Sequence, residues 1–354
     1  PVVLNLFMIS AMIAGKFFLG LSLKELAIFL CLSVVFAGVF QLALPWKKLK
    51  ESMDWKWEMT ITGSDEMDQI KSLFWVGALG AAVGQINILV SRFFAYSLEE
   101  SGGLSYLFLS SRLVELPLGV FAIAITTVLF PEMAKAVSRG EKARFLDSIY
   151  RGLRLTVGIT IPAAVGLALL AVPILTALFQ WGEFGGEEVN AASEVLLIAS
   201  VGLPFYAIST FLVKVYHSKK KMSFPLQAAS ISLFANLAFS VLLIEDYEVH
   251  GLAWANVFAA MIQTIYLVLR LEETPLNTFG VNQPIKLPSI LFSAGVMSGV
   301  LYFANQNMLI SQTKFGSILY LLVVIPVGIV AYSLCLFIFG FPELKAGMRK
   351  LFRT

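Results

Sequence analysis

Long apolar stretches, separated by short polar connections, follow one another along the whole chain. An α-helix needs about 20 apolar residues to cross a hydrocarbon core of about 30 Å, and each stretch reaches that length or nearly so. The stretches are residues 2–20, 26–45, 72–98, 104–130, 155–179, 191–213, 224–244, 250–269, 287–304 and 316–340. The pattern therefore predicts an all-α integral membrane protein with about ten transmembrane helices.

Basic residues gather in every second connection between these stretches. Most of the 26 Lys and Arg residues lie there or in the C-terminal tail: Lys47, Lys48, Lys50, Lys56, Lys71, Lys135, Arg139, Lys142, Arg144, Arg151, Arg154, Lys214, Lys219, Lys220, Lys221, Arg270, Lys286, Lys345, Arg349, Lys350 and Arg353. The alternate connections hold Lys24 and Lys314 together with acidic residues such as Glu183 and Glu245. Because cytoplasmic loops carry the excess of Lys and Arg, we predict that the basic connections and both chain ends are cytoplasmic.

The composition excludes a soluble domain. Of the 354 residues, 58% are apolar and 14% are charged, whereas a soluble domain carries about a quarter charged residues. The mean hydropathy is +0.81, and the net charge of +3 is small for a protein that binds nucleic acid. Cys31 and Cys335 lie far apart in apolar stretches, so we expect packing residues rather than a disulfide or a metal site. Since HExxH, GxSxG and P-loop motifs are absent, the sequence indicates a transporter without a cofactor rather than an enzyme.

Arg112 is the most informative polar residue inside a predicted span. It lies eight residues after Leu104, where its helix enters from the outside, which places it about 12 Å deep and close to the midplane. Glu115 follows on the same helix face, and Pro117 and Gly119 mark a point where the helix can bend. Two interpretations stay open. The residues form an internal ion pair that only packs, or the guanidinium faces a hydrated cavity and binds the phosphate oxygens of an anionic ligand.

Other polar residues in the spans are candidates for the same site. Gln85 and Asn87 lie deeper in their helix than Arg92, whose side chain is expected to reach the outer headgroups. Gln85, Asn87 and Asn236 either line a cavity or form hydrogen bonds between helices. Gln85, Asn87, Arg92, Arg112 and Glu115 are therefore the candidate substrate-binding residues.

The polar connections also carry predictions. Trp46–Lys71 mixes tryptophans with charged residues and is predicted to lie amphipathically on the cytoplasmic face, and Met133–Arg154 is predicted to do the same. The cytoplasmic basic turn, defined as Lys219, Lys220 and Lys221, is expected to contact anionic lipid and to help fix the orientation of the chain.

Several segments resemble a known family. The run GQINILVSRFFAYSLEESGGLSYLFLSSRLVELPLGVFAIAITTVLFPEMAK, residues 84–135, resembles the signature region of the MurJ (MviN) lipid II flippases. That family shows Q-I-N in one helix, then D-R-L-x-x-L-P-x-G, then A-x-x-T-V-L-x-P. Residues 179–184, FQWGEF, resemble its F-x-x-G-x-F; residues 216–225, YHSKKKMSFP, resemble its F-Y-A-R-x-D-x-x-T-P; and residues 1–5, PVVLN, resemble the P-x-L-x-N that opens its fifth helix.

This chain departs from the family pattern at several positions. Ser111 stands where the family has the acid before its cavity arginine, and the acid of the Q-I-N helix is replaced near Ser91 and Arg92. The Y-A-R-x-D turn has become His217 to Lys221. The family has fourteen helices and this chain resembles it from the fifth onward, so we expect an N-terminally incomplete chain.

The resemblance implies the fold of the multidrug/oligosaccharidyl-lipid/polysaccharide exporters, in which two helix lobes flank a cavity, here without the first four helices. Residues 1–45 would be the last two helices of the first lobe and 72–271 the six helices of the second. Residues 46–71 would connect the lobes on the cytoplasmic face, 287–341 would form an additional helix pair, and 342–354 would be a basic cytoplasmic tail.

The function that the resemblance implies is outward flipping of lipid II, the undecaprenyl-pyrophosphate-linked peptidoglycan precursor, by alternating access in the bacterial inner membrane. Arg112 would bind the diphosphate while the lipid tail stays in the bilayer. One alternative is export of another lipid-linked oligosaccharide or of a small cation. A second is a membrane scaffold that recruits cell-wall synthesis proteins through Trp46–Lys71.

Overall fold

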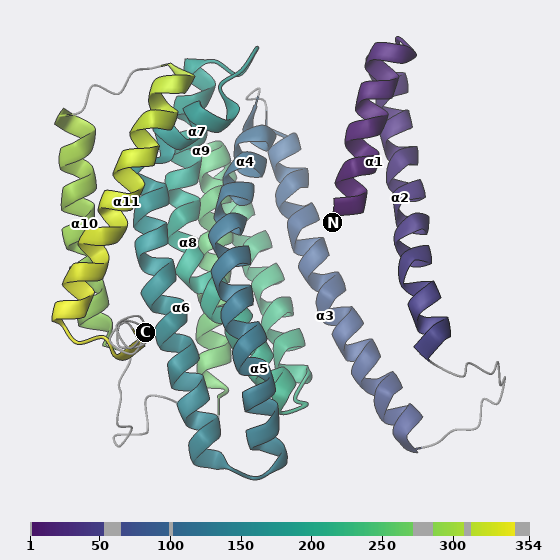
Figure 1. Ribbon diagram of the computed structural model, residues 1–354, viewed down its shortest axis with the longest axis vertical. Helices are drawn as coiled ribbons and strands as arrows, with labels where there is room; N and C mark the ends of the chain where they lie inside the picture. Colours follow the sequence, from purple (N-terminus) through teal and green to yellow (C-terminus); the bar gives the residue numbers. More distant parts are fainter. Residues whose placement is uncertain (1, 53–64, 99–101, 272–285, 308–312, 344–354) are drawn as a thin grey trace. The chain divides into compact units, whose positions relative to one another are not determined.

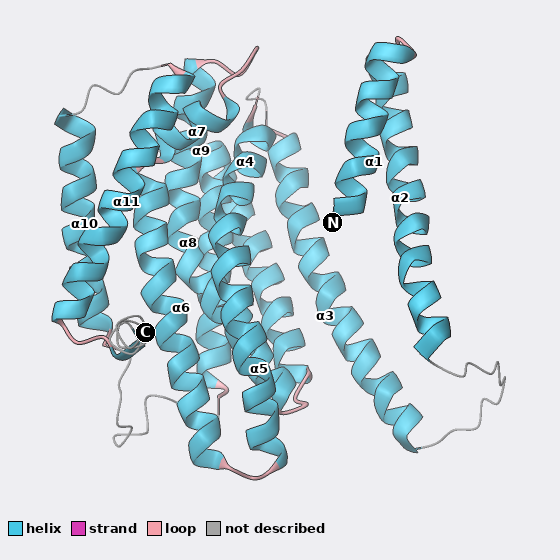
Figure 2. Ribbon diagram, viewed as in Figure 1, coloured by secondary structure: helices cyan, strands magenta, loops and turns pink. Residues whose placement is uncertain are grey.

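The computed structural model describes residues 2–52, 65–98, 102–271, 286–307 and 313–343. These residues form helices joined by turns, with a single isolated bridge between Trp181 and Phe184 in place of any strand (Figure 2). The chain divides into two compact units, residues Pro1–Ser64 and Asp65–Thr354. Each unit is described by itself.

The first unit is a helical hairpin. Helix α1 (Val2–Ile13) continues into the π-helix η1 (Ala14–Phe18), and α2 (Leu23–Ser52) runs back beside it. The turn requires Gly20, which has φ +60°, a backbone conformation that other residues rarely adopt. The helices approach closely at Gly15, where a Cβ atom would lie 2.6 Å from Leu26 Cδ1. A small residue at the crossing is typical of helix pairs in membranes.

The second unit contains the remaining helices (Figure 1). They are α3 (Asp65–Tyr96), α4 (Gly103–Pro117), the π-helix η2 (Leu118–Ala122), α5 (Ile123–Ser138), α6 (Lys142–Leu169), α7 (Ala171–Phe179), α8 (Gly186–Ser218), α9 (Ser223–Leu269), α10 (Leu287–Asn307) and α11 (Lys314–Ile338). Helices α4, η2 and α5 follow one another without a gap, and α10 packs against α11.

Helix α9 is two helices that meet at a sharp kink. Glu248 there has φ 46° and ψ −125°, which is not helical. Gly251 permits the close return of the chain, because a Cβ atom on it would lie 2.4 Å from the carbonyl oxygen of Leu243. The halves lie side by side, as the 5.1 Å between the ring centroids of Phe239 and Phe258 shows. The two predicted stretches 224–244 and 250–269 are these halves.

Eight helices in the described part of the chain are long and apolar enough to cross a membrane, with α4–η2–α5 and α9 each counted once. Val2–Phe18 is a shorter apolar helix. Each of the ten stretches found in the sequence lies in helix, so the prediction of an all-helical membrane fold is confirmed.

Two boundaries predicted from the sequence are wrong. The stretch 155–179 is not one span: α6 begins at Lys142, and the short helix α7 follows after Leu170. Met133–Arg154 is likewise not a separate surface segment. It comprises the end of α5, a turn and the start of α6, and its apolar side chains Met133, Phe145 and Ile149 are buried in the helix core. Amphipathic periodicity arises equally from a helix that packs on neighbours and from one that lies on a membrane.

The predicted connection 46–71 is partly helical. Helix α2 continues to Ser52 and α3 begins at Asp65. Trp55 and Trp57, which carry the prediction of an amphipathic surface segment, lie outside the described residues.

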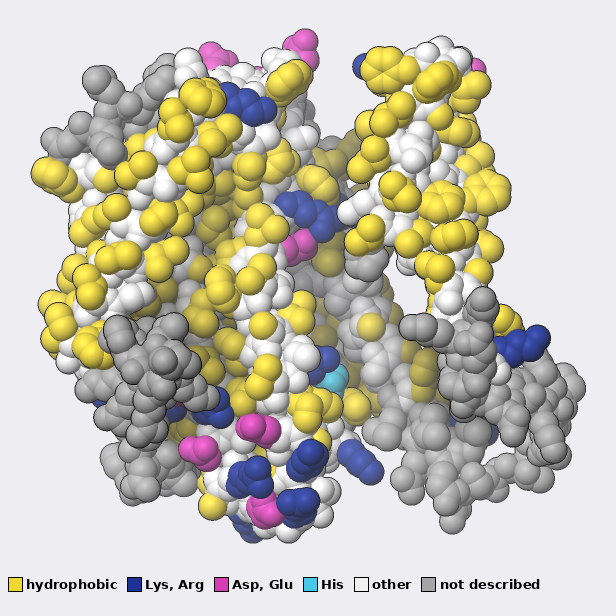
Figure 3. Space-filling view, viewed as in Figure 1, with side chains coloured by type: hydrophobic (Ala, Val, Ile, Leu, Met, Phe, Trp, Pro, Cys, Tyr) yellow, Lys and Arg dark blue, Asp and Glu magenta, His cyan; other side chains and the backbone are white. Residues whose placement is uncertain are grey.

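Helix packing in the second unit is tight on the inside and apolar on the outside. Gly152 of α6 lies against Phe211 of α8, where a Cβ atom would be 2.1 Å from the ring. Large apolar side chains such as Val128, Phe234 and Leu322 are exposed, as expected for helices whose outer faces contact lipid. On the face in Figure 3, charged side chains of this unit gather mainly where α5 turns into α6, and the surface beyond is largely hydrophobic.

Candidate functional site

Arg112 and Glu115 form an ion pair on α4. Arg112 Nη1 donates to Glu115 Oε2 at 2.7 Å. Each side chain is 55% exposed, so the pair lies on the surface of the helix unit and not in its packed interior. The Arg112 guanidinium also lies 5.0 Å from the centroid of the Phe108 ring, one helical turn earlier. This contact orients the guanidinium plane and leaves most of its hydrogen-bond donors available.

A second guanidinium lies beside the same ring. Arg92 of α3 is 5.9 Å from the Phe108 centroid, and no carboxylate among the described residues is within ion-pair distance of it. Phe108 thus brings cations from α3 and α4 to one aromatic side chain. The sequence placed both arginines in spans of adjacent helices, but it gave no sign that Phe108 would lie between them.

The helix that carries Arg112 is interrupted two residues after Glu115. Pro117 ends α4, and the following five residues, which include Gly119, form η2 before α5 resumes α-helical geometry. Proline lacks the N–H that would bond the preceding turn, and π-helical segments inside α-helices occur mostly at functional sites. Both residues predicted as a hinge therefore lie at an irregular segment.

The two sides of this segment differ in the helices on which they mainly pack. Ser110 of α4 donates to the carbonyl of Ala192 in α8 at 3.5 Å, whereas Leu129 and Met133 of α5 pack both with Phe145 of α6 and with Phe211 of α8. A bend at η2 would therefore change the position of the Arg112 half of the helix relative to the α5 half.

Asn87 belongs to a neutral polar cluster, defined as Asn87, Ser91, Asn236, Ser240 and Asn256. Asn236 is fully buried, and its Nδ2 donates to Asn87 Oδ1 at 2.6 Å, to Ser91 Oγ at 2.9 Å and to Asn256 Oδ1 at 3.4 Å. Ser91 donates to Asn256 Oδ1 at 3.1 Å, and Ser240 donates to Asn236 Oδ1 at 3.3 Å. The cluster joins α3 to both halves of α9.

In the neutral polar cluster, Asn87 and Asn236 form a hydrogen bond between α3 and α9, as one of the two interpretations expects. Gln85, by contrast, is exposed. Sequence analysis missed the contributions of Ser91, Ser240 and Asn256. An asparagine in the middle of an apolar span, as Asn256 is, was the available signal.

The basic turn, Lys219 to Lys221, connects α8 to α9. Lys220 has φ 58°, and the amides of Lys219 and Lys221 donate to the carbonyl of Tyr216 at 3.1 and 3.0 Å. Lys219 Nζ lies 5.2 Å from the Phe145 ring centroid. The turn follows Ala192, which α4 contacts, by 27 residues, or roughly 40 Å along α8. It is therefore remote from Arg112.

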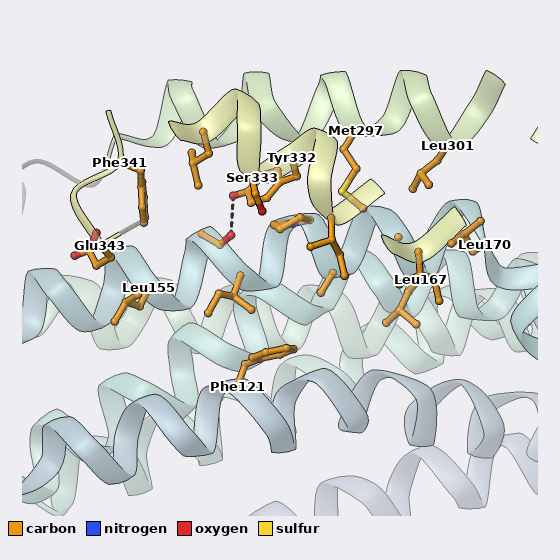
Figure 4. Close-up of a pocket in the computed structure, with 18 of the residues that line it drawn as sticks. Phe121, Leu155, Leu167, Leu170, Met297, Leu301, Tyr332, Ser333, Phe341 and Glu343 are labelled. Carbon is orange, nitrogen blue, oxygen red and sulfur yellow. Dashed lines mark hydrogen bonds between the residues drawn. The ribbon is translucent and has the colours of Figure 1, made fainter. Parts of the chain in front are cut away.

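An apolar pocket of about 570 Å³ lies between α6, α10 and α11 (Figure 4). Phe121 of η2, Met297 of α10 and Tyr332 of α11 contribute to its walls. Tyr332 donates to the carbonyl of Gly158 at 2.6 Å, which fixes α11 on α6. No pattern in the sequence indicated this pocket, because its apolar walls come from five helices and the segment after α11, which are far apart in the chain.

Comparison with solved structures defines the class of the fold. An outward-facing multidrug resistance MATE family transporter of the MOP superfamily matches with a TM-score of 0.51 at 16% identity, over 79% of this chain and 67% of that chain. A lipid II flippase MurJ in an inward closed conformation matches with a TM-score of 0.72 at 25% identity, over 95% of this chain and 66% of that chain. The chain has the helical fold of this superfamily of membrane transporters.

The sequence comparisons narrow the class to one family. The model of the family "Lipid II flippase MurJ" matches residues 1–339. A probable lipid II flippase MurJ of Haemophilus influenzae is 28% identical over 353 residues, and one of Bdellovibrio bacteriovorus is 30% identical over 271. This chain belongs to the MurJ lipid II flippase family, a family of transporters and not of enzymes, which confirms the resemblance seen in its motifs. The alignments cover 67% and 51% of those two relatives.

Proposed function

We propose that this chain takes part in flipping lipid II, an undecaprenyl-pyrophosphate-linked precursor, from the cytoplasmic to the outer leaflet by alternating access. The observation that carries the proposal is the pair of guanidinium groups, Arg92 and Arg112, on two helices beside Phe108. Guanidinium groups bind phosphate oxygens in a planar, two-point fashion. Two of them at one place suit a diphosphate better than a single carboxylate or a neutral glycan.

The exposure of the Arg112–Glu115 pair supports ligand binding over packing alone. A solvated ion pair contributes only about 0–1 kcal/mol, and each partner here is 55% exposed. A diphosphate can therefore displace Glu115 from Arg112 at little cost. In this scheme Glu115 neutralises Arg112 between transport cycles, and Arg92 supplies the second cation.

The neutral polar cluster favours an anionic substrate over the alternative of a small cation. Its five side chains are amides and hydroxyls, and their donors and acceptors already bond to one another. Hard cations are held mainly by carboxylate and carbonyl oxygens. Ser91 immediately precedes Arg92. We therefore propose that the neutral polar cluster holds the part of α3 that carries Arg92 against α9.

Substitution of Arg112 tests the diphosphate role. In the full-length protein, Arg112→Lys keeps the charge but loses the two-point geometry, so we expect normal membrane abundance with failure to support growth of a flippase-depleted bacterium. The paired change Arg112→Met with Glu115→Met removes the ion pair without leaving an uncompensated charge, and it should also be abundant and inactive. Growth of the paired variant at normal abundance would show that the ion pair only packs.

We further propose that the basic connections face the cytoplasm of a bacterial inner membrane. The asymmetry of Lys and Arg between alternate connections supports this orientation. Cysteines at Glu187, at the start of α8, and at Ser138, at the end of α5, lie on opposite sides in the proposed topology. Glu187→Cys should react with an impermeant thiol reagent on intact cells, and Ser138→Cys only after lysis. The reverse labelling pattern would contradict the orientation.

A further inference from the structure

One face of α8 carries a row of polar side chains in the half of the helix that leads to the basic turn. This polar face consists of side chains that are exposed or half-buried: Tyr206, Thr210, Lys214 and His217. At 3.6 residues per turn, all of them lie within about 40° of Ala192 around the helix axis. The carbonyl of Ala192 accepts the hydrogen bond from Ser110, so the polar face continues the side of α8 that α4 covers nearer its start.

The break at η2 leaves the polar face uncovered. After η2 the chain continues as α5, which meets α8 at Phe211, about 100° around the helix from Ala192. On the other side of the polar face, Tyr216 donates to the carbonyl of Leu267 in α9 at 2.8 Å. The polar face therefore lies between the contacts of α8 with α5 and with α9.

Lys214 and His217 present hydrogen-bond donors that have no acceptor. They are three residues apart, so their side chains are neighbours on the helix surface. Neither side chain has a carboxylate within ion-pair distance or a hydrogen-bond acceptor among the described residues. An ammonium donates from three N–H groups, and an imidazole donates from one nitrogen even when it is neutral. A positive charge beside an N–H donor, with no acid to neutralise it, suits a phosphate group.

Two hydroxyl groups lead from this pair toward α4. Thr210 lies one turn before Lys214, and Tyr206 lies one turn before Thr210, about 12 Å from Lys214 along the helix. The ring of Tyr206 lies back over Gly202, where a Cβ atom would be 2.6 Å from Tyr206 Cε2, and its hydroxyl has no hydrogen-bond partner among the described residues. Tyr206 also packs against the core cluster that contains Val114 of α4. The polar groups thus extend from the basic end of α8 to α4.

We propose that Lys214 and His217 form an entry site that binds the diphosphate of the lipid-linked substrate before Arg112 does. The orientation proposed above places this end of α8 in the cytoplasm, where the substrate starts. The hydroxyls of Thr210 and Tyr206 then offer hydrogen bonds to the headgroup on its way to Arg112, which lies roughly 30 Å further along α8. The inference rests on the proposed function and adds a second substrate site to it.

Binding of a short polyprenyl diphosphate to the full-length protein in detergent tests the entry site. The paired variant Arg112→Met with Glu115→Met is the background, so that Arg112 does not contribute. Farnesyl diphosphate, farnesyl monophosphate and phosphatidylglycerol are titrated in turn, with native mass spectrometry as the readout. We expect farnesyl diphosphate to bind at least about tenfold more tightly than phosphatidylglycerol, because its second phosphate accepts an additional charged hydrogen bond. Equal affinity for these two lipids would reduce the pair to an ordinary contact with membrane phospholipid and overturn the proposal.

Substitutions in the same background locate the bound diphosphate. Lys214→Gln should weaken binding of farnesyl diphosphate about tenfold and His217→Ala several-fold, since each removes a donor to a charged group. Lys219→Gln is the matched control: it removes a lysine from the same end of α8, but the Lys219 Nζ lies over the Phe145 ring of α6. The control should bind as tightly as the background. Equal weakening by Lys219→Gln would show that only the general positive charge of this end attracts the probe, and the proposal would fail.

Transport kinetics separate this inference from the proposed function. Lys214→Gln in the otherwise unaltered protein should raise the substrate concentration for half-maximal flipping several-fold and leave the maximal rate unchanged, because the pair acts before Arg112. Binding that depends on Lys214 in a protein that does not flip the substrate would keep the entry site and reject the proposed function. Flipping with no Lys214-dependent binding would do the reverse. If Lys214→Gln does not accumulate, His217→Ala and the lipid series still decide the question.

Discussion

Polar residues of the second unit occur in two contrasting environments. In the neutral polar cluster, amides and hydroxyls from α3 and α9 bond to one another; Asn236 and Ser240 are fully buried, and Asn87, Ser91 and Asn256 are half-buried. At the Arg112 site, the guanidiniums of Arg92 and Arg112 lie beside Phe108, and Arg112 pairs with Glu115 while both are more than half exposed. Ser91 of the cluster directly precedes Arg92 of the site, so both arrangements meet on one helix.

The difference separates a structural role from a binding role. A buried polar group without partners is costly, so a cluster whose groups bond to one another stabilises one helix arrangement and has few groups left for a ligand. Exposed charges are bonded weakly and can exchange partners. Polar residues inside membrane spans are therefore best interpreted after their burial and bonding are known, because residue type alone does not distinguish these cases.

The largest effect is expected when the neutral polar cluster is broken. Asn236→Leu removes the donor to the half-buried Asn87 and Ser91, and it leaves the buried Ser240 hydroxyl without its acceptor. We expect a loss of roughly 2–3 kcal/mol in stability and a several-fold fall in membrane abundance. Quantitative immunoblotting and thermal unfolding in detergent measure both.

Gln85→Leu is the matched control for this prediction. It makes the same amide-to-leucine change on α3, but at an exposed side chain, so abundance should not change. Normal abundance of Asn236→Leu would contradict a structural role for the cluster. Loss of transport at normal abundance would instead assign Asn236 to a functional site.

More of the Arg112 site than of the neutral polar cluster could be predicted from the sequence, and the reason is physical. The Arg112–Glu115 contact and the break at Pro117 are local, since they depend on residues within one or two helical turns. The bonds among Asn87, Asn236 and Asn256 depend on the rotation and depth at which separate helices pack. One sequence carries no direct record of those quantities.

The same reason explains the remaining successes and errors. The existence of the helices could be predicted from the length of the apolar stretches, which local composition determines. The start of α6 at Lys142 was not predicted. An apolar stretch indicates the part of a helix that lies in the bilayer, and not how far the helix continues beyond it. The apolar pocket could not be predicted, since it arises where the segment after α11 returns to α6.

A smaller effect is expected at the predicted hinge, Pro117 and Gly119. The contrast between the neutral polar cluster and the Arg112 site predicts that a change there lowers flipping activity but not stability. Pro117→Ala restores a backbone N–H and favours regular helix across η2. Abundance should be normal, and the rate of flipping should fall because the two halves of the helix, α4 and α5, would then move together. Pro131→Ala, an exposed proline in α5 away from the break, is the control and should transport normally. Transport at the unaltered rate by Pro117→Ala would remove η2 from the mechanism.

The smallest effect is expected at the basic turn, Lys219 to Lys221, and it tests whether a cation beside an aromatic ring is enough to bind substrate. Lys219 lies over Phe145 at 5.2 Å as Arg112 lies over Phe108 at 5.0 Å, yet the turn is remote from the Arg112 site. An exposed cation–π contact contributes about 0.5–1 kcal/mol, so Lys219→Gln should lower thermal stability slightly. Lys220→Gln is the matched comparison and should not lower it, because no aromatic ring of the described residues lies beside the Lys220 cation. Each substitution should also weaken binding to anionic vesicles by roughly 1 kcal/mol, measured by flotation, and neither should change which lipid-linked substrate is moved. A change of substrate in the Lys219 variant would show that a cation beside an aromatic ring is enough for substrate selectivity. The proposed role of Arg112 would then no longer depend on the geometry of its guanidinium.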